Sequence, residues 1–300
     1  MPFLFKFHLH RVLLRPLANG IKQLKTLSDE TTKWRMAQGD RLTGKDLFSA
    51  LLEAKDPETG HGFAQSELIS EAGLLIIGGT DTTITGTTST IFYLLNNPSA
   101  LARLQHEIRT EFSEVEDIRI GPQLEKCRFL TSCITESLRL TPPVGSLLPR
   151  EVLPGGITID GELFPPGTDI GVPHYALHHS EDEFSAPFEF QPERWLNKPS
   201  PHGQESLPST GTLQTQGHPA FTPFGVGRTS CIGKHLAYQE MSLVLARVVW
   251  LYDMRTAPSP SAAKRTVSSA KQFPTLDRFV SAHDGPMVQF MPRNLRTRSP

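Results

Sequence analysis

The sequence predicts a mainly α fold with a smaller β part, and three observations support this fold class. Apolar residues recur at helical spacing over much of the chain before Pro142. After Pro142 the pattern changes to short strand-like runs between turn residues. Charged residues make up only 20% of the 300-residue chain, which is not typical of a disordered protein. Helices first and sheet pieces later indicate an α-rich domain with a segregated sheet.

Several helices are expected in the first half, and one is much longer than the others. It begins near Ser66 and ends at Leu95, because the following Asn-Asn-Pro sequence disfavours helix before the proline. At about 1.5 Å per residue, this helix would be about 45 Å long. The expected helices cover residues 21–38, 46–55, 66–95, 98–112 and 130–140.

Smaller elements are expected after these helices. Residues 157–159 form a strand that enters a hairpin turn at Asp160-Gly161, and residues 165–167 form a further turn. Residues 232–252 form an apolar helix, and a second hairpin is expected around Asp284-Gly285.

Charge and hydropathy disfavour a nucleic-acid-binding surface and a membrane-spanning segment. The chain has 30 basic and 31 acidic residues and a net charge of -1, so no basic surface for nucleic acid is expected. No run of about 18 apolar residues predicts a membrane span. Five basic residues precede the first acid, Asp29, and could support peripheral membrane contact or simply an ordinary basic helix. These residues are Lys6, Arg11, Arg15, Lys22 and Lys25.

Three cysteines, Cys127, Cys133 and Cys231, are too few for a disulfide framework. Their odd number indicates a reducing compartment or one thiol with a function. Cys231 stands before an apolar helix in the glycine-flanked run from Phe224 to Gly233. A helix N-terminus favours a thiolate. From the residues alone, Cys231 is a nucleophile, an inert buried cysteine or an axial haem ligand.

Histidines near this chemistry favour polar surface positions over metal binding. His174, His178 and His179 are interpreted as residues of a polar loop. His235 lies four residues after Cys231, but no further pair completes a zinc site.

The centre of the long helix carries the run Gly-Gly-Thr-Asp-Thr-Thr at residues 78–83. Glycine costs about 1 kcal/mol relative to alanine in a helix interior, so this run opposes local helix stability. Such a conflict is typical of a functional site, with Asp81 as an acid and Thr82 as a hydroxyl able to bond the preceding turn. A seam of small residues for helix packing is the alternative.

Glu136 and Arg139 lie three residues apart and can pair on one helix face. Arg194, in the sequence Pro-Glu-Arg-Trp at residues 192–195, could join them in a locked buried cluster. An exposed ion pair of little energetic value is the alternative.

Four of these motifs occur together in the order known from one family. They are residues 78–83, the Glu136-x-x-Arg139 pair, residues 192–195 and residues 224–233, with connecting segments 149–152 and 164–168. In this set the chain resembles the cytochrome P-450 family of haem-thiolate monooxygenases, in a style similar to fungal members. The resemblance covers roughly residues 66–293. It implies a cytochrome P-450 fold that lacks its N-terminal portion.

The resemblance implies a role for each matching residue of the cysteine segment. Cys231 would be the axial thiolate ligand of haem b iron. Phe224 would shield the sulfur, while Gly227 and Gly233 would shape the turn. The family usually has a basic residue two places before the cysteine, where this chain has Thr229, with Arg228 one place earlier.

The other matching residues are assigned by the same resemblance. Asp81 and Thr82 would line the oxygen site and deliver protons, bordered by Gly78 and Gly79, and Arg150 would meet a haem propionate. The turn at Asp284-Gly285 would form part of the substrate ceiling. The structural cluster would be Glu136, Arg139 and Arg194.

The resemblance also implies a single partial domain, because full-length members begin well before Met1. Their early part carries a membrane anchor, so this chain without an anchor could be soluble. The implied division is a helical lead-in (1–62), a long oxygen-site helix (63–97), further helices (98–143), a β-rich part with the meander (144–196), a flexible loop (197–217), the haem-cysteine loop and helix (218–252), and a C-terminal hairpin and tail (253–300).

The implied activity is insertion of one oxygen atom of O2 into an organic small molecule, within secondary metabolite biosynthesis. Electrons would come from NADPH through an NADPH-cytochrome reductase, at the endoplasmic reticulum membrane for full-length relatives. A truncated, non-catalytic haem-binding remnant is the alternative. Isomerisation or dehydration is disfavoured, because Asp81 and Thr82 fill both oxygen-handling positions.

Overall fold

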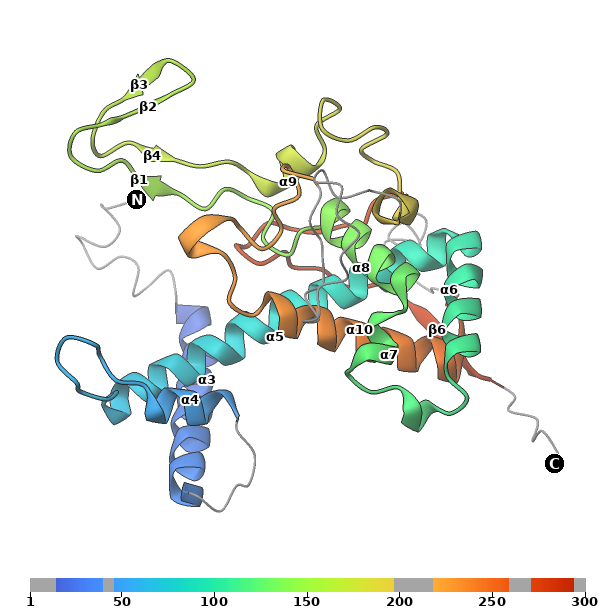
Figure 1. Ribbon diagram of the computed structural model, residues 1–300, viewed down its shortest axis with the longest axis horizontal. Coiled ribbons are helices and arrows are strands. Elements are labelled where there is room, and N and C mark those ends of the chain that lie inside the picture. The colour runs from blue at the N-terminus through green and yellow to red at the C-terminus, as the bar shows by residue number, and fades with distance from the viewer. Residues whose placement is uncertain (1–14, 40–45, 197–217, 259–270, 294–300) are drawn as a thin grey trace. The chain divides into compact units, whose positions relative to one another are not determined.

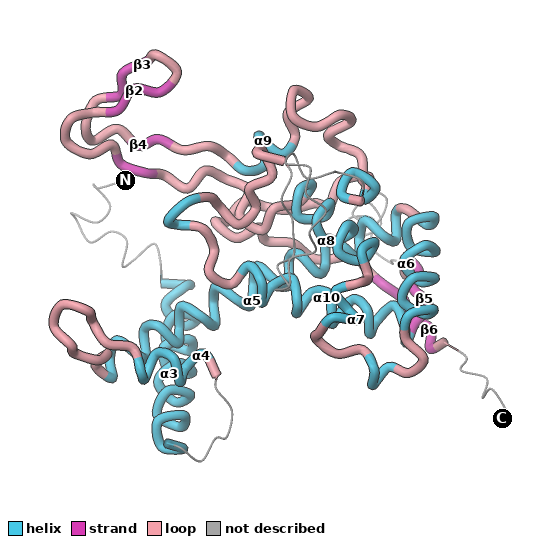
Figure 2. Tube along the Cα trace, viewed as in Figure 1, coloured by secondary structure: helices cyan, strands magenta, loops and turns pink. Residues whose placement is uncertain are grey.

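The computed structural model describes residues 15–39, 46–196, 218–258 and 271–293 (Figure 1). Helices dominate these residues and three small two-stranded sheets accompany them, so the prediction of a mainly α fold is confirmed (Figure 2). The chain divides into two compact units, residues 1–80 and 81–300. The expected loop at 197–217 lies outside the described residues.

The first unit contains α3 (Arg15–Gln38), α4 (Leu47–Glu53) and the first half of α5 (Gln65–Asn96). α3 begins six residues before the predicted start at residue 21. Arg35 of α3 binds Asp46 through Nε and Nη2 at 2.8 and 3.3 Å. Asp46 in turn caps α4, where it accepts a hydrogen bond from the backbone N–H of Ser49 at 2.7 Å.

The second unit is built around α8 (Arg128–Leu140), whose residues are buried on nearly every side. α6 (Pro98–Glu111) and α10 (Lys234–Leu251) pack against it. α6 begins at the proline that ends α5 and buries one apolar face, as the helical spacing predicts. The shared core of the three helices includes Leu104, Ile108, Leu130, Ile134, Tyr238, Met241, Leu245 and Val249.

The second half of α5 lies close to side chains of α8 and α10 at Gly86. A Cβ atom added there would lie 2.7 Å from Sδ of Met241 and 3.2 Å from Cδ2 of Leu138. By contrast, a Cβ atom added at Gly78 or Gly79 would meet no described atom within 4 Å. The small-residue packing position is therefore Gly86, and the run at residues 78–83 does not provide it.

The β part consists of three antiparallel pairs. β1 (Arg150–Glu151) pairs with β4 (Asp169–Ile170), and β2 (Ile157–Ile159) pairs with β3 (Glu162–Phe164). The β2–β3 hairpin turns at Asp160 and Gly161, as predicted, with φ values of +48° and +85°. Positive φ at both turn residues is the conformation that Asp-Gly sequences favour in tight hairpins.

The third pair corrects the prediction for the C-terminal region. β5 (Tyr252–Thr256) directly follows α10 and pairs with β6 (Val288–Pro292), so no hairpin closes at Asp284-Gly285. Gly285 does turn the chain with a φ of +66°, but the residues immediately before this turn form no strand that pairs with β6. The local turn signal was correct, while the pairing is long-range.

Short elements complete the described chain. The segment between α6 and α8 contains η2 (Val115–Asp117) and α7 (Pro122–Glu125), which were not predicted. The later segments contain α9 (His174–His178), η3 (Pro192–Trp195) and η4 (Gly227–Thr229). No helix of the described residues is long and apolar enough to cross a bilayer.

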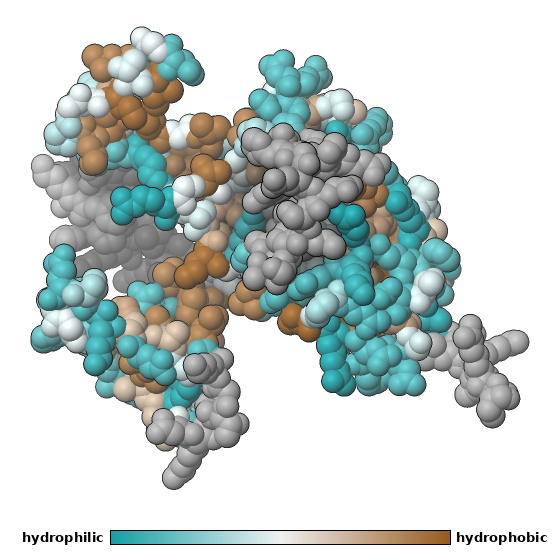
Figure 3. All heavy atoms as spheres, viewed as in Figure 1, coloured by the Kyte–Doolittle hydropathy of each residue, from teal (hydrophilic) through white to brown (hydrophobic). Residues whose placement is uncertain are grey.

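Apolar side chains are exposed on the β2–β3 hairpin and the loop before it (Figure 3). Leu153 and Leu163 expose 73% and 69% of their surface, and Ile157 exposes 45%. The hairpin therefore buries little apolar surface against the core of its own unit, which forms around α8 instead.

Candidate functional site

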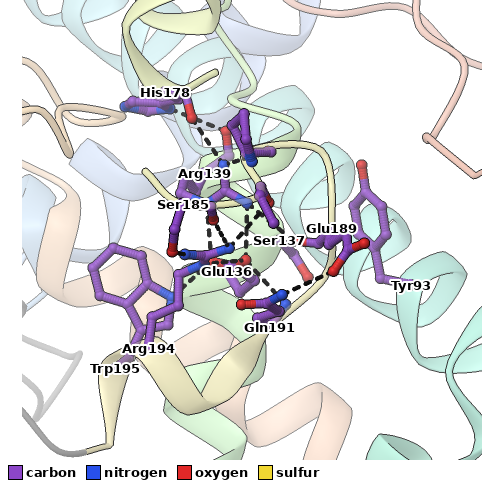
Figure 4. A network of polar contacts seen from close by, with 12 residues as sticks. Tyr93, Glu136, Ser137, Arg139, His178, Ser185, Glu189, Gln191, Arg194 and Trp195 are labelled. Atoms are coloured by element: carbon purple, nitrogen blue, oxygen red, sulfur yellow. Dashed lines mark hydrogen bonds and ion pairs between the residues drawn. The ribbon is translucent and has the colours of Figure 1, made fainter. Parts of the chain in front are cut away.

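Glu136 lies at the centre of a buried polar network (Figure 4). Its carboxylate accepts two hydrogen bonds from Arg139, at 3.0 Å from Nε and 2.8 Å from Nη2. Arg194 donates from Nε at 3.0 Å, and Trp195 donates from its indole nitrogen at 2.9 Å. The backbone N–H of Gln191 donates at 3.0 Å. A buried carboxylate needs a paired charge and satisfied oxygens, and both conditions are met.

The two arginines also bind backbone carbonyl groups of the segment after α9. Arg139 donates from Nη1 to the carbonyls of His178 and Pro187 at 2.8 and 2.7 Å. Arg194 donates from Nη2 to the carbonyl of Ser185 at 2.7 Å. The planar fork of each guanidinium can bind several acceptors at once, so the cluster holds α8 to a segment distant in sequence. The exposed ion pair that the sequence also allowed is not what the structure contains.

The prediction of a polar loop at His174, His178 and His179 is wrong. His174 and His178 lie in α9, and His178 has no exposed surface. Its burial is stable because both ring nitrogens have backbone partners. Nδ1 lies 3.1 Å from the carbonyl oxygen of Arg139, and Nε2 accepts from the backbone N–H of Thr222 at 2.9 Å.

Cys231 lies in a loop before α10, and its side chain is exposed. Its backbone N–H donates to the carbonyl of Phe224 at 2.7 Å, which closes the loop. The ring of Phe224 packs against Tyr238 of α10, with ring centroids 5.5 Å apart. α10 begins only at Lys234, so Cys231 precedes the first helical turn. The loop is thus anchored on α10 while the sulfur stays accessible.

Two glycines give this loop its course. Gly225 and Gly227 have φ values of +67° and +70°, in the left-handed region that other residues rarely adopt. Gly233 has a φ of -82° and is the N-cap of α10, so its backbone conformation suits any residue. The sequence reasoning chose Gly227 and Gly233 for the turn and did not single out Gly225.

Arg150, at the start of β1, donates a hydrogen bond from Nη2 to Oγ1 of Thr229 at 3.2 Å. Its other guanidinium nitrogen binds the carbonyl of Pro149 at 3.0 Å. Thr229 stands where the family usually has a basic residue, and Arg150 brings a cation to that place from another segment. Arg228, its neighbour in η4, is exposed.

Asp81 and Thr82 lie in α5, where Asp81 is exposed and Thr82 is half-buried. The hydroxyl of Thr85 donates to the carbonyl of Asp81 at 2.9 Å. It also lies 3.4 Å from the carbonyl oxygen of Ser281, in the segment before Gly285. The C-terminal segment therefore reaches this part of α5 within the second unit.

The donor set of the described residues fits a haem better than a zinc ion. Among these residues no group of three or more His, Cys, Asp or Glu side chains could hold a metal ion. A structural or catalytic zinc ion requires at least three protein ligands. Haem iron requires a single axial ligand such as a cysteine thiolate, because the porphyrin supplies four nitrogens. His235 is exposed, and Cys231 on its glycine-turned loop can act as such a ligand.

These features define a class of mainly α proteins. Its members combine a buried Glu-Arg-Arg cluster with a cysteine loop that precedes a helix, here α10. The chain belongs to the cytochrome P-450 family, whose family profile, described as Cytochrome P-450, matches residues 1–272. Family membership implies a haem iron.

Curated relatives support the same assignment. The chain is 36% identical to the cytochrome P-450 monooxygenase apf7 of Gibberella fujikuroi over 98% of this chain and 56% of the relative. It is 40% identical to AKT7 of Alternaria alternata over 82% of this chain and 48% of the relative. It is 36% identical to lcsN of Purpureocillium lilacinum over 86% of this chain and 76% of the relative. The chain thus spans about half the length of the first two relatives.

Proposed function

We propose that the chain carries the haem-binding part of a monooxygenase, with Cys231 as the axial thiolate ligand. The observation that carries the proposal is the exposed Cys231 on a loop closed against Phe224, in a chain of the cytochrome P-450 family. When bound, the haem supplies the chemistry that inserts one oxygen atom of O2 into an organic small molecule.

The residues around Cys231 hold the thiolate and leave room for a flat partner. Phe224 covers one side of the loop through its contact with Tyr238. A Cβ atom added at Gly227 would meet no described atom within 4 Å, so this turn leaves space beside the backbone. Gly233 separates Cys231 from the first turn of α10.

Arg150 and Arg228 are the cations proposed for the haem carboxylates. Arg150 is the stronger candidate, because Thr229 already holds its guanidinium at the usual basic position. Arg228 is exposed in the same turn, and no described residue is seen to hold its guanidinium as Thr229 holds that of Arg150. A planar guanidinium suits a carboxylate because it can donate two parallel hydrogen bonds.

Asp81 and Thr82 are proposed to handle protons for the same reaction. The Thr82 hydroxyl can accept and donate a proton at Oγ1, while the exposed Asp81 carboxylate can exchange protons with water. The buried cluster of Glu136, Arg139 and Arg194 has a structural role, since it holds α8 to the segment between α9 and η3.

The wider setting is also part of the proposal. NADPH electrons would arrive through an NADPH-cytochrome reductase, at the endoplasmic reticulum membrane, and the product would belong to a fungal secondary pathway. The substrate class is an organic small molecule.

The ferrous–CO spectrum of the haem-loaded chain tests the proposal. We expect the long-wavelength Soret band of a thiolate-ligated haem, and its loss in Cys231→Ala. Cys127→Ala is the matched control and should keep the band, because Cys127 is buried in the core near α8. A haem-loaded wild-type chain without this band, or a band that survives Cys231→Ala, would refute the proposal.

A non-catalytic haem-binding chain is the alternative to a monooxygenase. The two candidates differ in electron use. A monooxygenase consumes NADPH in the presence of a reductase and produces an oxygenated product, whereas the non-catalytic chain shows the thiolate-type spectrum and no product.

A further inference from the structure

Two histidines of α9 bind the backbone N–H and the hydroxyl group of Thr222. His178 accepts a hydrogen bond at Nε2 from the backbone N–H of Thr222 at 2.9 Å. His174, one turn earlier, places Nδ1 2.8 Å from the Thr222 hydroxyl oxygen. Thr222 is buried, and its contact with His178 is shielded from water, while its contact with the half-buried His174 is partly shielded. A buried backbone N–H needs a hydrogen-bond partner, and for Thr222 the ring of His178 supplies it.

His178 is itself held on the buried Glu-Arg-Arg cluster by a reciprocal pair of hydrogen bonds. The guanidinium of Arg139 donates to the carbonyl of His178 at 2.8 Å. In return, Nδ1 of His178 donates to the carbonyl of Arg139 at 3.1 Å. Arg139 is fixed by Glu136, so His178 has a rigid support on α8.

The partners of His178 determine its tautomer. A carbonyl oxygen can only accept and a backbone N–H can only donate, so the proton sits on Nδ1 and the lone pair on Nε2. Burial lowers the pKa of His178 to about 3, which keeps this neutral form. The ring also stacks on Phe221, with centroids 5.6 Å apart and an interplanar angle of 24°.

Thr222 connects His178 to the cysteine loop through backbone hydrogen bonds. Its carbonyl accepts from the backbone N–H of Gly225 at 2.9 Å, which closes the turn that contains Phe224. The carbonyl of Phe224 then accepts from the backbone N–H of Cys231 at 2.7 Å. A chain of short contacts therefore runs from the buried cluster through His178 to the backbone of Cys231.

We propose that His178 is a positioning residue for Cys231: its neutral ring links Arg139 to Thr222 and so fixes the entrance of the cysteine loop. The role rests on the proposed function of Cys231 as a ligand. Partners that orient a metal ligand from outside its coordination sphere commonly control how well the ligand binds. The first unit of the chain takes no part in this link.

Amide hydrogen exchange of the haem-free chain tests the link without any activity. His178→Leu removes both ring nitrogens, and we expect exchange at Gly225 and Cys231 to accelerate about tenfold, as for the loss of one buried hydrogen bond. Amides of α10 such as that of Val249 should change far less. Equal acceleration at all sites, or none at Gly225 and Cys231, would show that His178 does not position the loop.

Three further variants make the test specific. His178→Gln retains a donor and an acceptor and should restore part of the protection. His179→Leu is the matched control, because its ring binds Tyr175 and not the segment of Thr222. Thr222→Val removes only the hydroxyl contact with His174, so it provides a milder perturbation if His178→Leu does not fold.

The ferrous–CO spectrum then separates this proposal from the function of Cys231. If the wild type shows a thiolate-type band, His178→Leu should convert a larger fraction of the haem to the form without thiolate than His179→Leu does. An identical spectrum in both variants would overturn the positioning role. A wild type without the band would count against the ligand role of Cys231, while the exchange data would still decide the link from His178 to the loop.

Discussion

Gly86 and Met241 face each other across the contact between α5 and α10 with no room for a methyl group. A Cβ atom at position 86 would lie 2.7 Å from the Met241 sulfur, well inside normal contact distance. The absence of a side chain at Gly86 therefore leaves room for the Met241 side chain beside α5.

Gly86→Ala should destabilise the second unit. Overpacking a dense core costs about 1–3 kcal/mol, against a gain of at most about 1 kcal/mol from the better helix propensity of alanine. Urea unfolding of Gly86→Ala, Met241→Ala and the double variant measures the coupling between the two sites. We expect the alanine at position 86 to be less harmful when Met241 is truncated; strictly additive losses would contradict the steric argument.

Glu136→Ala should be among the most destabilising changes in the chain. Glu136 and Arg139 are both fully buried, so removing the carboxylate leaves a buried guanidinium without its counter-charge. Breaking a buried pair in this way costs about 3–5 kcal/mol in the free energy of unfolding. Glu193→Ala is the control, since its partner Arg103 is half-exposed and such pairs contribute about 0–1 kcal/mol. Similar losses in the two variants would argue against the central role of the buried cluster.

Arg150→Ala should weaken haem binding more than Arg228→Ala. Both arginines are exposed, but the hydroxyl of Thr229 orients the Arg150 guanidinium. Loss of one charge-assisted contact corresponds to about a tenfold loss in affinity. Titration of the haem-free variants with haem gives the two dissociation constants directly. If Arg228→Ala has the larger effect, the carboxylate partner is Arg228 and the assignment of Arg150 is incorrect.

His178 should make folding stability depend on pH. Burial is the main cause that lowers its pKa to about 3, with positive Arg139 and the neighbouring His174 and His179 acting in the same direction. The negative charge near this group is on Glu136, which pairs with Arg139. Between about pH 6.5 and pH 3 the unfolded chain binds a proton that the folded chain does not, so the contribution of His178 is complete above pH 6.5 and decreases as the pH falls.

The comparison of wild type with His178→Phe isolates this contribution. The difference in unfolding free energy should shrink by up to about 1.36 kcal/mol for each pH unit below 6. Urea unfolding at pH 7.5, 6, 5 and 4.5 measures this slope. A difference that stays constant over this range would mean that His178 is not buried as a neutral ring.

Elements with local signals were predictable from the sequence. Pro98 ends α5 and begins α6, because proline restricts the residue before it and suits the first helical turn. Asp160 and Gly161 specify the β2–β3 turn through their tolerance of positive φ. These features depend on a few neighbouring residues, so no knowledge of the tertiary structure was needed.

Elements that depend on distant partners were not predictable. α9 is a five-residue helix, and its His178 is buried because Arg139 and Thr222 satisfy both ring nitrogens. β6 pairs with β5 rather than with a neighbour across Gly285, and each strand has only five residues. Short apolar runs carry no information about which distant segment will supply their hydrogen bonds.

The candidate site shows the same division. The sequence motifs predicted that Glu136, Arg139 and Arg194 form one cluster. The burial of this cluster, however, depends on carbonyl groups from residues 178–189. Gly225 was not singled out and His178 was interpreted as part of a polar loop, because a second glycine in a loop and a histidine pair are common features. Only the positive φ of Gly225 and the two partners of His178 distinguish them.

The different surroundings of the three cysteines make the chain selectively addressable by thiol reagents. Burial raises the pKa of Cys127 to about 12 and raises the pKa of Cys133 well above its ordinary value, so neither forms a thiolate at neutral pH. Cys231 alone is exposed. A maleimide dye or spin label added to the unmodified wild-type chain would attach at Cys231 and report on that loop without any engineered cysteine.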